Sequence, residues 1–240
     1  MQTLKGKKAI VTGAGKGIGR AIALALAAEE VELALWDRSA TELQNVAAEI
    51  QQINAGLRTK TYVVDISDYT QVRQQAALFF QDFGEADILI NNAGIFNMAG
   101  ILELEVEDFE KVFRTNVFGS FYMIKEILPG MINRKSGDIV NIASSAGAKG
   151  SPRLGAYGAS KAALINLSES VMQEARKADV RVTTVNPSTI VTDMTINAKL
   201  TDGKNENVLR PVDLATIVVH NLKLPARVLI KDFALWSTNP

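Results

Sequence analysis

The sequence predicts one α/β domain built on a doubly wound sheet whose strands are mostly or wholly parallel. Two observations lead to this expectation. Short apolar segments rich in β-branched residues alternate with longer helix-forming segments. The short segments also lack the apolar/polar alternation of half-exposed strands, as expected where helices cover both faces of a sheet. Helical crossovers of this length join parallel strands, and no linker divides residues 1–240, so we expect a single domain.

The expected elements follow one another along the whole chain. Strands are predicted over 9–12, 31–36, 61–64, 87–90, 138–143 and 180–185, and helices over 18–26, 40–53, 69–83, 106–114, 117–132, 157–177 and 212–222. Pro129 falls inside the helix over 117–132, which it is expected to kink or end early. The apolar segment 228–236 is expected to form an edge strand.

One segment lacks a clear pattern of apolar residues. Residues 195–207 are polar, contain few large apolar side chains and follow a strand-end loop. Ligands of parallel sheets bind beyond the carboxyl ends of the strands. We therefore expect a substrate lid over residues 193–210, with an ordinary surface insertion as the alternative.

Composition excludes several classes of protein and site. The 26 Lys and Arg residues balance the 26 Asp and Glu residues, so no broad field attracts nucleic acid or anionic lipid. The chain has no cysteine and only one histidine, His220, which leaves no typical metal site. It also lacks a signal-like leader and any window of about 18 uncharged apolar residues. We expect a cytoplasmic enzyme or binding protein.

A glycine-rich turn lies between the first strand and the first helix. It reads Thr12-Gly13-Ala14-Gly15-Lys16-Gly17-Ile18-Gly19. Glycines permit a tight turn, and the amides at a helix N-terminus bind a pyrophosphate. Asp37 follows eighteen residues after Gly19, at the end of the second strand. An acid there accepts both ribose hydroxyls and repels a 2′-phosphate, which predicts NAD.

Two cations and a second acid surround the same predicted site. Lys16 and Arg38 could bind a 2′-phosphate, so NADP remains the alternative cofactor. Asp65 ends the third strand, and its carboxylate either bonds the adenine amino group or caps the segment that begins at Ser67.

A tyrosine, a lysine and a serine carry the predicted chemistry. Tyr157 and Lys161 lie four residues apart, hence on one helix face, and Ser144 ends the strand over 139–143. A tyrosine pKa near 10 falls by about 1–3 units beside a cation within ~4–6 Å. We therefore expect Tyr157 to exchange a proton with a carbonyl or alcohol oxygen that Ser144 also bonds. A nicotinamide must supply or accept the hydride.

In this order, the motifs resemble those of the short-chain dehydrogenase/reductase family over nearly the full length. They are Thr12-Gly13-x-x-x-Gly17-Ile18-Gly19, Asn91-Asn92-Ala93-Gly94, Asn116, Ser144, Tyr157-x-x-x-Lys161 and Asn186-Pro187. The resemblance implies a Rossmann-type fold and NAD(P)-dependent interconversion of a carbonyl and a secondary alcohol. The sequence departs from the family pattern at Ser188, where the family usually has glycine. This departure puts the nearby contact with the nicotinamide carboxamide in question.

The resemblance also implies roles for individual residues. The segment Asn91 to Gly94, including Ala93, would shape the adenine-side pocket, to which we also assign Ile66. Asn116 would hold a water in a proton relay to Lys161, and Lys161 would bind the nicotinamide ribose. The residues implied at the nicotinamide end are Pro187, Ile190 and Thr192.

The sequence leaves more than one substrate class and more than one partner open. The core motifs are similar to those of 3-oxoacyl-(acyl-carrier-protein) reductases, and Arg134 with Lys135 could form part of a docking patch for acyl carrier protein. The segment 227–240 instead resembles reductases of other small carbonyls, so a small ketone, diketone or hydroxy acid is the alternative to a thioester. The family resemblance also implies a dimer or tetramer. A nucleotide-sensing protein without turnover is the hypothesis from another class.

Overall fold

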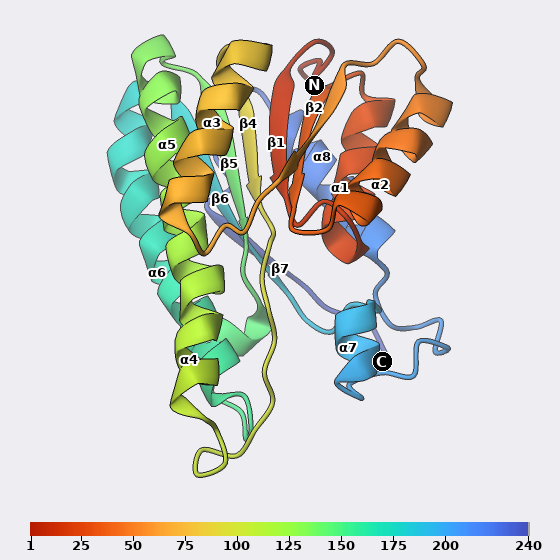
Figure 1. The fold of residues 1–240 in the computed structure, drawn as a ribbon, viewed down its shortest axis with the longest axis vertical. Helices are drawn as coiled ribbons and strands as arrows, with labels where there is room; N and C mark the ends of the chain where they lie inside the picture. Colours follow the sequence, from red (N-terminus) through yellow and green to blue (C-terminus); the bar gives the residue numbers. More distant parts are fainter. Residues whose placement is uncertain (240) are drawn as a thin grey trace.

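The computed structural model describes residues 1–239 and confirms the α/β prediction (Figure 1). Its sheet has seven strands, all parallel, in the order β3-β2-β1-β4-β5-β6-β7. The strands are β1 Lys8–Thr12, β2 Glu32–Asp37, β3 Thr59–Val63, β4 Ile88–Asn91, β5 Gly137–Ile142, β6 Val180–Pro187 and β7 Asp232–Leu235. The α-helices are α1 Gly17–Ala28, α2 Ala40–Ile53, α3 Tyr69–Phe83, α4 Val106–Phe113, α5 Ser120–Arg134, α6 Gly155–Ala175, α7 Asp193–Asn197 and α8 Pro211–Leu222.

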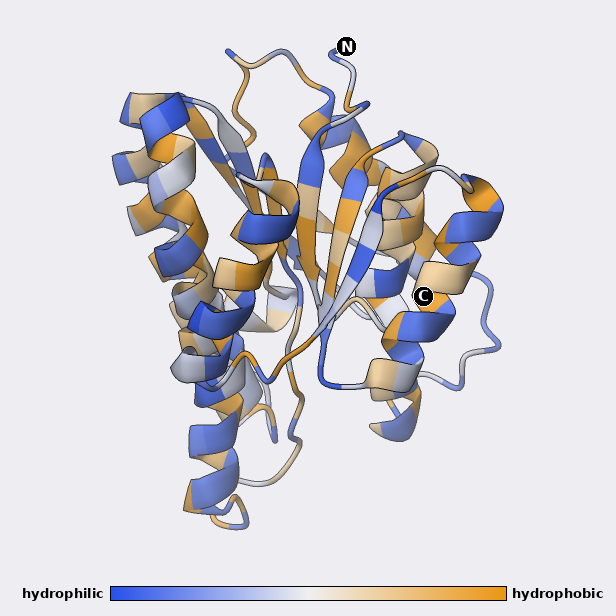
Figure 2. Cartoon of the chain, turned by 45° about the horizontal axis from the view of Figure 1, so that its top comes forward, coloured by the Kyte–Doolittle hydropathy of each residue, from blue (hydrophilic) through white to orange (hydrophobic). Residues whose placement is uncertain are grey.

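Helices cover both faces of the sheet, as the apolar strands require. One core cluster joins the sheet to α1, α2 and α8, and the other joins it to α3, α5 and α6. Figure 2 shows hydrophobic residues on the helix sides that face the sheet and hydrophilic residues on the outer sides. Strands that are covered by helices on both faces carry apolar side chains on both faces, so they do not alternate apolar with polar residues.

The strand order reverses next to β1. From β1 the chain first adds β2 and β3 on one side, and then adds β4 to β7 on the other. The loops after β1 and β4 therefore leave the sheet in opposite directions. A crevice opens between them at the carboxyl edge, where doubly wound sheets bind their ligands.

Three local features differ from the expectations. Of the two outcomes expected at Pro129, an early end is wrong, because α5 continues to Arg134, and a kink stays a prediction. Ile127 and Met131 are both buried on either side of the proline, and their packing offsets the lost backbone hydrogen bond. A π-helix over Arg114–Gly119 joins α4 to α5, so the two predicted helices form one continuous helical stretch. Residues 193–197 of the expected lid, for which no helix was predicted, form the short helix α7.

Within residues 1–239, no helix combines the length and the apolar character that crossing a membrane would require.

A buried ion pair fixes the amino edge of the sheet, opposite the crevice. Arg181 at the start of β6 donates through Nε to Asp138 Oδ1 at 2.6 Å, and both side chains are at most 10% exposed. The same guanidinium donates to the carbonyls of Leu222, Leu224 and Val228. Arg181 thereby ties the connection between α8 and β7 to the central sheet.

Removing one partner of this pair should destabilise the fold without touching the crevice. Asp138→Ala leaves Arg181 as a buried charge without its counterion, and we expect a loss of about 3–5 kcal/mol in the free energy of unfolding. The matched control is Glu110→Ala, which removes an exposed pair with Arg114 and should cost less than about 1 kcal/mol. Urea unfolding of the two variants measures the difference. Equal losses would contradict the role given to Arg181.

Candidate active site

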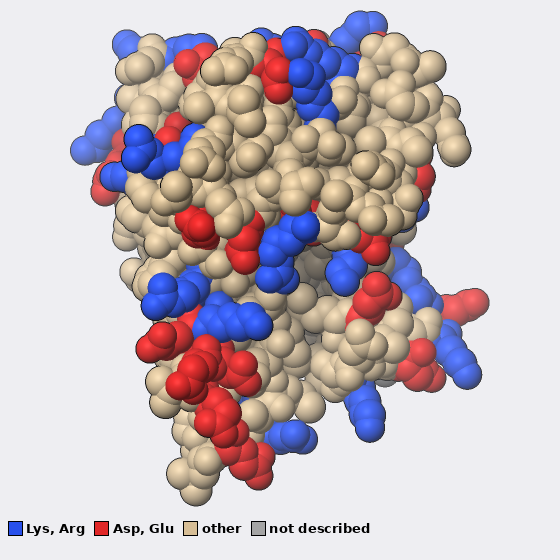
Figure 3. Space-filling model, in the orientation of Figure 1, with Lys and Arg blue, Asp and Glu red and all other residues tan. Residues whose placement is uncertain are grey.

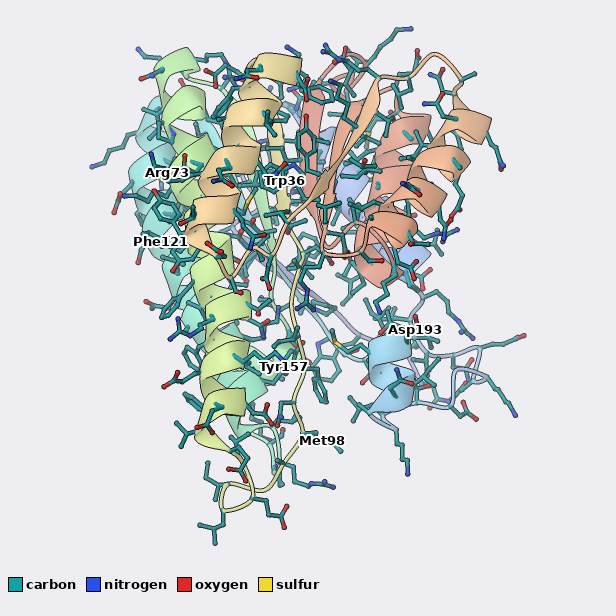
Figure 4. All side chains as sticks on the ribbon, in the orientation of Figure 1. Trp36, Arg73, Met98, Phe121, Tyr157 and Asp193 are labelled. Atoms are coloured by element: carbon teal, nitrogen blue, oxygen red, sulfur yellow. The ribbon has the colours of Figure 1, made fainter. Side chains whose placement is uncertain are left out.

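A cleft of about 250 Å³ lies at the carboxyl edge of the sheet, where the strand order reverses. Figure 3 shows the opening in the middle of the visible face, with both basic and acidic side chains at its rim. The glycine-rich turn lines one part of the cleft, and the ends of β5 and β6 line another. In Figure 4, Tyr157 and Asp193 lie on opposite sides of the opening.

The glycine-rich turn is braced by the loop that follows β4. The Thr12 hydroxyl accepts hydrogen bonds from the amides of Asn92 and Ala93, and the Asn92 side chain donates to the carbonyls of Thr12 and Gly13. Gly13 has a φ of 65°, which favours glycine. A Cβ at Gly19 would lie 2.0 Å from the Gly13 carbonyl oxygen. This close packing brings the turn directly onto the N-terminus of α1, as a pyrophosphate cradle requires.

Asp37 is fixed at the end of β2 and lines the cleft. Its Oδ2 accepts from the Gly15 amide at 3.2 Å, and its Oδ1 accepts from the Ser39 amide at 3.1 Å. Two cations, Lys16 and Arg38, line the cleft beside it. The carboxylate that the sequence predicts for the ribose thus lines the cleft, as do the two cations that argued for NADP, and the ribose contact stays a prediction.

Asp65 does not cap the following helix. Its Oδ1 accepts from both the amide and the hydroxyl of Ser67, which closes a short turn, while Asp68 caps α3. The capping alternative was therefore wrong. Asp65 Oδ2 lies 3.8 Å from Arg38 Nη1, and both residues line the cleft. The adenine contact of Asp65 stays a prediction.

Tyr157, Ser144 and Lys161 gather at the other end of the cleft. Tyr157 and Lys161 come from the first turns of α6, and Ser144 follows β5. The Lys161 Nζ lies 5.8 Å from the Tyr157 ring centroid and donates to the Ile142 carbonyl at 2.8 Å. Burial of Lys161 lowers its pKa from 10.5 to about 8. Within residues 1–239 the ammonium has no carboxylate partner, and a backbone carbonyl holds it beside the phenol.

The predicted lowering of the tyrosine pKa by lysine is not what the structure shows. Burial raises the pKa of Tyr157 above its ordinary value, and a hydrogen bond with Ser144 opposes that rise. The sequence argument considered the helical spacing of Tyr157 and Lys161 but not the burial of both. Desolvation disfavours the charged form of each group, and here it dominates.

Asn116 supports the site from behind. It lies in the π-helix and is fully buried. Its side chain exchanges two hydrogen bonds with the backbone of Ile95, at 2.8 and 3.0 Å, and donates to the Ser160 hydroxyl at 3.0 Å. Ser160 in turn donates to the Tyr157 carbonyl at 2.7 Å. The side chain joins three segments, and the water relay to Lys161 stays a prediction.

Most of the predicted residues meet in the one cleft. Those that line it are Gly13, Lys16, Gly17, Ile18, Asp37, Arg38, Asp65, Ile66, Ala93, Gly94, Ser144, Tyr157, Lys161, Pro187, Ile190 and Thr192. Gly19, Asn91 and Asn116 lie behind the lining. Asn91 is not at the cleft because it is buried in the sheet, where it donates to Asn141 at 2.8 Å.

The sequence argument missed several lining residues. They are Trp36, Val64, Ile95, Thr115, Ile142 and Ala143. Many directly precede or follow a predicted residue, so widening each motif by one or two positions would have found them. Asp193, Met194 and Thr195 fall within the lid predicted over residues 193–210, although the sequence argument did not assign them individually to the cleft wall.

The lining fits a dinucleotide. A Cβ at Gly94 would lie 3.1 Å from Asn116 Oδ1 and 3.6 Å from Lys161 Nζ. A glycine at this position therefore keeps side-chain atoms out of this part of the cleft. The turn at one end suits a pyrophosphate, Asp37 suits a ribose, and the other end holds a proton-transfer group. The part of the chain that the structure describes contains no cluster of metal-ligating side chains.

Comparisons with known proteins agree with this geometry. A family model described as short chain dehydrogenase matches residues 7–203. An uncharacterized oxidoreductase of Staphylococcus saprophyticus is 34% identical over 97% of this chain and 97% of its own length. An alcohol dehydrogenase from the archaeon Thermococcus sibiricus, complexed with 5-hydroxy-NADP, is 29% identical, with a TM-score of 0.90 over 98% of both chains. An NAD+-bound xylitol dehydrogenase is 27% identical, with a TM-score of 0.90 over 98% of this chain and 100% of that one.

The buried lysine should cost stability. Below about pH 8 Lys161 is charged in both the folded and the unfolded chain, and its burial penalises the folded one. Between about pH 8 and 10 the folded chain holds fewer protons, so stability rises with pH. We expect Lys161→Met to raise the free energy of unfolding at pH 7 by roughly 1–3 kcal/mol.

The gain should shrink at pH 9.5, where most of the penalty on wild type has gone. Urea unfolding at the two pH values measures it, and Lys125→Met is the control for an exposed lysine on α5. A Lys161→Met variant that is less stable than wild type at pH 7 would contradict the burial argument.

Proposed function

Because this chain belongs to the short-chain dehydrogenase/reductase family, we propose that it is an NAD-preferring enzyme acting on a small, uncharged ketone or secondary alcohol. Membership makes the chain an oxidoreductase that interconverts a carbonyl and an alcohol with NAD(P). The observation that carries the proposal is the presence, in one cleft, of a dinucleotide cradle around Asp37 and a proton-transfer group at Tyr157.

The chain's own residues position the substrate and move the proton. A bound nicotinamide supplies or accepts the hydride, which no side chain can provide. During reduction the Tyr157 hydroxyl donates its proton to the carbonyl oxygen, and Ser144 hydrogen-bonds to the same oxygen. Lys161 is charged below about pH 8 and stabilises the phenolate that remains, since a nearby cation favours the charged form. During oxidation the same groups act in reverse.

The proposed preference for NAD rests on Asp37. Its carboxylate is held in place by the two amides of Gly15 and Ser39, so it cannot easily turn away from a ribose. A 2′-phosphate would meet this fixed negative charge. Arg38 Nη1 lies 3.8 Å from Asp65 Oδ2, and the Arg38 side chain is 59% exposed. Its attraction for a 2′-phosphate is therefore weakened by the nearby carboxylate and screened by solvent.

The proposed substrate class rests on the cleft lining on the two sides of the opening, at Tyr157 and across from it at α7. Apolar side chains of the lining include Ile95, Ile190 and Met194. Asp193 is the acid of this wall and disfavours a substrate carboxylate or phosphate. A neutral ketone therefore fits better than a hydroxy acid.

The proposed carrier contact has little support. Arg134 Nη1 donates to Glu85 at 2.9 Å and its Nη2 donates to the Ala86 carbonyl at 2.7 Å, which places it beyond the amino end of β4. That end is opposite the cleft, so Arg134 is not a docking group beside the active site. We retain acyl carrier protein and its thioesters only as one arm of the substrate test.

We also propose that residues 193–210 act as a lid and that the protein forms a homo-oligomer. Support for the lid is that α7 contributes Asp193, Met194 and Thr195 to the cleft wall. Support for self-association is the exposure of Phe118, Phe121 and Trp236, since large exposed apolar side chains often mark protein contacts.

Replacing the phenol should abolish turnover while sparing the cofactor. For Tyr157→Phe we expect kcat to fall about 10²–10⁴-fold, the usual contribution of a general acid, with little change in the Kd of NADH. The control is Tyr69→Phe, whose hydroxyl donates to Glu126 instead of facing the cleft. Nicotinamide absorbance, followed with ketones, diketones, polyols and 3-oxoacyl thioesters, measures both.

Turnover that survives Tyr157→Phe would overturn the assigned acid. Cofactor binding by wild type without turnover on the whole panel would favour the nucleotide sensor. Thioesters as the best substrates would overturn the proposed substrate class.

Removing the ribose-facing acid should relax cofactor choice. For Asp37→Ala we expect the ratio of kcat/KM with NAD to that with NADP to fall roughly 10- to 100-fold, since a charged hydrogen-bond acceptor is lost and its repulsion disappears. Arg38→Ala serves as the opposite control and should leave the ratio unchanged or raise it. An unchanged ratio in the Asp37 variant would sink the proposed role of the carboxylate.

A further inference from the structure

The nicotinamide end of the cleft needs a partner for a carboxamide. The ring must lie beside Tyr157 and Ser144, because hydride and proton are added to the two atoms of one carbonyl bond. A carboxamide carries both a hydrogen-bond acceptor and donors, and burying it without partners costs free energy. The hydroxyl groups at this end are therefore the first candidates.

Three of those hydroxyls already have partners. The Thr192 and Thr195 hydroxyls lie 3.2 Å apart, and Thr195 also donates to the Ile190 carbonyl at 2.7 Å. Together they form the capping box that starts α7. The Ser144 hydroxyl accepts from the Ala146 amide and bonds Tyr157.

The Ser188 hydroxyl, on the segment that follows β6, is a candidate without such a partner. Ser188 lines the cleft, and its Oγ makes no hydrogen bond within the described residues. Its amide donates to the Leu235 carbonyl at 2.8 Å, which extends the ladder between β6 and β7. Its φ is not positive, so the serine sits there without backbone strain.

The strand pattern decides which way this side chain faces. Val182, on β6, packs in the core cluster that contains Met172 and Ala175 of α6. Residues separated by an even number along a strand share a face of the sheet. Ser188 comes six residues after Val182, so its side chain faces the α6 side, from which Tyr157 also reaches the cleft.

We propose that the Ser188 hydroxyl donates a hydrogen bond to the nicotinamide carboxamide oxygen and so fixes the orientation of the ring. This inference rests on NAD(P) binding in the cleft but not on the proposed substrate. Ser188 is a cofactor-positioning residue: an amide oxygen held by it would set which ring face is presented to the substrate next to Tyr157 and Ser144.

Direct binding tests this without any substrate. For Ser188→Ala we expect the Kd of NADH, measured by isothermal titration calorimetry, to rise about 2- to 10-fold, the effect of one neutral hydrogen bond. The Kd of ADP-ribose, which lacks the nicotinamide, should not change. The matched serine control is Ser170→Ala, on the exposed side of α6, which should leave both values unchanged.

Cofactor analogues identify the atom involved. With the thionicotinamide analogue, whose sulfur is a poor acceptor, wild type and Ser188→Ala should bind with nearly equal Kd. With the acetylpyridine analogue, which keeps the carbonyl oxygen and lacks the NH2 group, the difference should persist.

Equal Kd values for NADH in wild type and Ser188→Ala would overturn this inference alone. So would an equal loss of ADP-ribose affinity, since that would indicate a general change in the cleft. Failure of wild type to bind either NADH or NADPH would overturn both this inference and the proposed function.

Discussion

The active site depends on the burial of one ammonium group to which the described part of the chain gives no counterion. Lys161 gives its hydrogen bond to the Ile142 carbonyl at the end of β5, and its pKa falls to about 8 because water is excluded. A group that costs stability in this way persists only where the surrounding fold over-determines its position. The long helix α6 and the carboxyl edge of the sheet supply that support, and they bring the same ammonium next to the phenol of Tyr157.

Buried amides transmit this rigidity between the strands and the helices. Asn91 on β4 donates to Asn141 on β5, which donates to Ser168 on α6, so the catalytic helix is bonded to two central strands. Asn116 adds a second connection through Ser160. Buried polar networks fix one arrangement when each donor has a partner. Residues behind the cleft therefore matter to the chemistry although they touch no ligand.

The fold and most of the site could be predicted because they rest on local patterns. Apolar strands, helix-length crossovers and a glycine turn before α1 each carry a signal within a short window, and the strand order then brings Asp37 and Tyr157 to one edge. What failed depends on tertiary packing at one place and on local hydrogen bonding at two. Packing of Ile127 and Met131 carries α5 through Pro129, the π-helix at Asn116 changes only the hydrogen-bond register, and α7 is held by the Thr192 and Thr195 capping box.

The pKa of Tyr157 shows where spacing stops being informative. Four residues along a helix place an ammonium near a phenol, but the sign of the net shift depends on how much water both groups lose. Here desolvation wins, and it raises the pKa of the phenol while lowering that of the lysine. The two pKa values therefore move apart, and near pH 7 the phenol is neutral while the ammonium is charged. Desolvation therefore keeps Tyr157 protonated, as a proton donor to a carbonyl oxygen must be, and the charged Lys161 remains beside it to stabilise the phenolate that the transfer leaves.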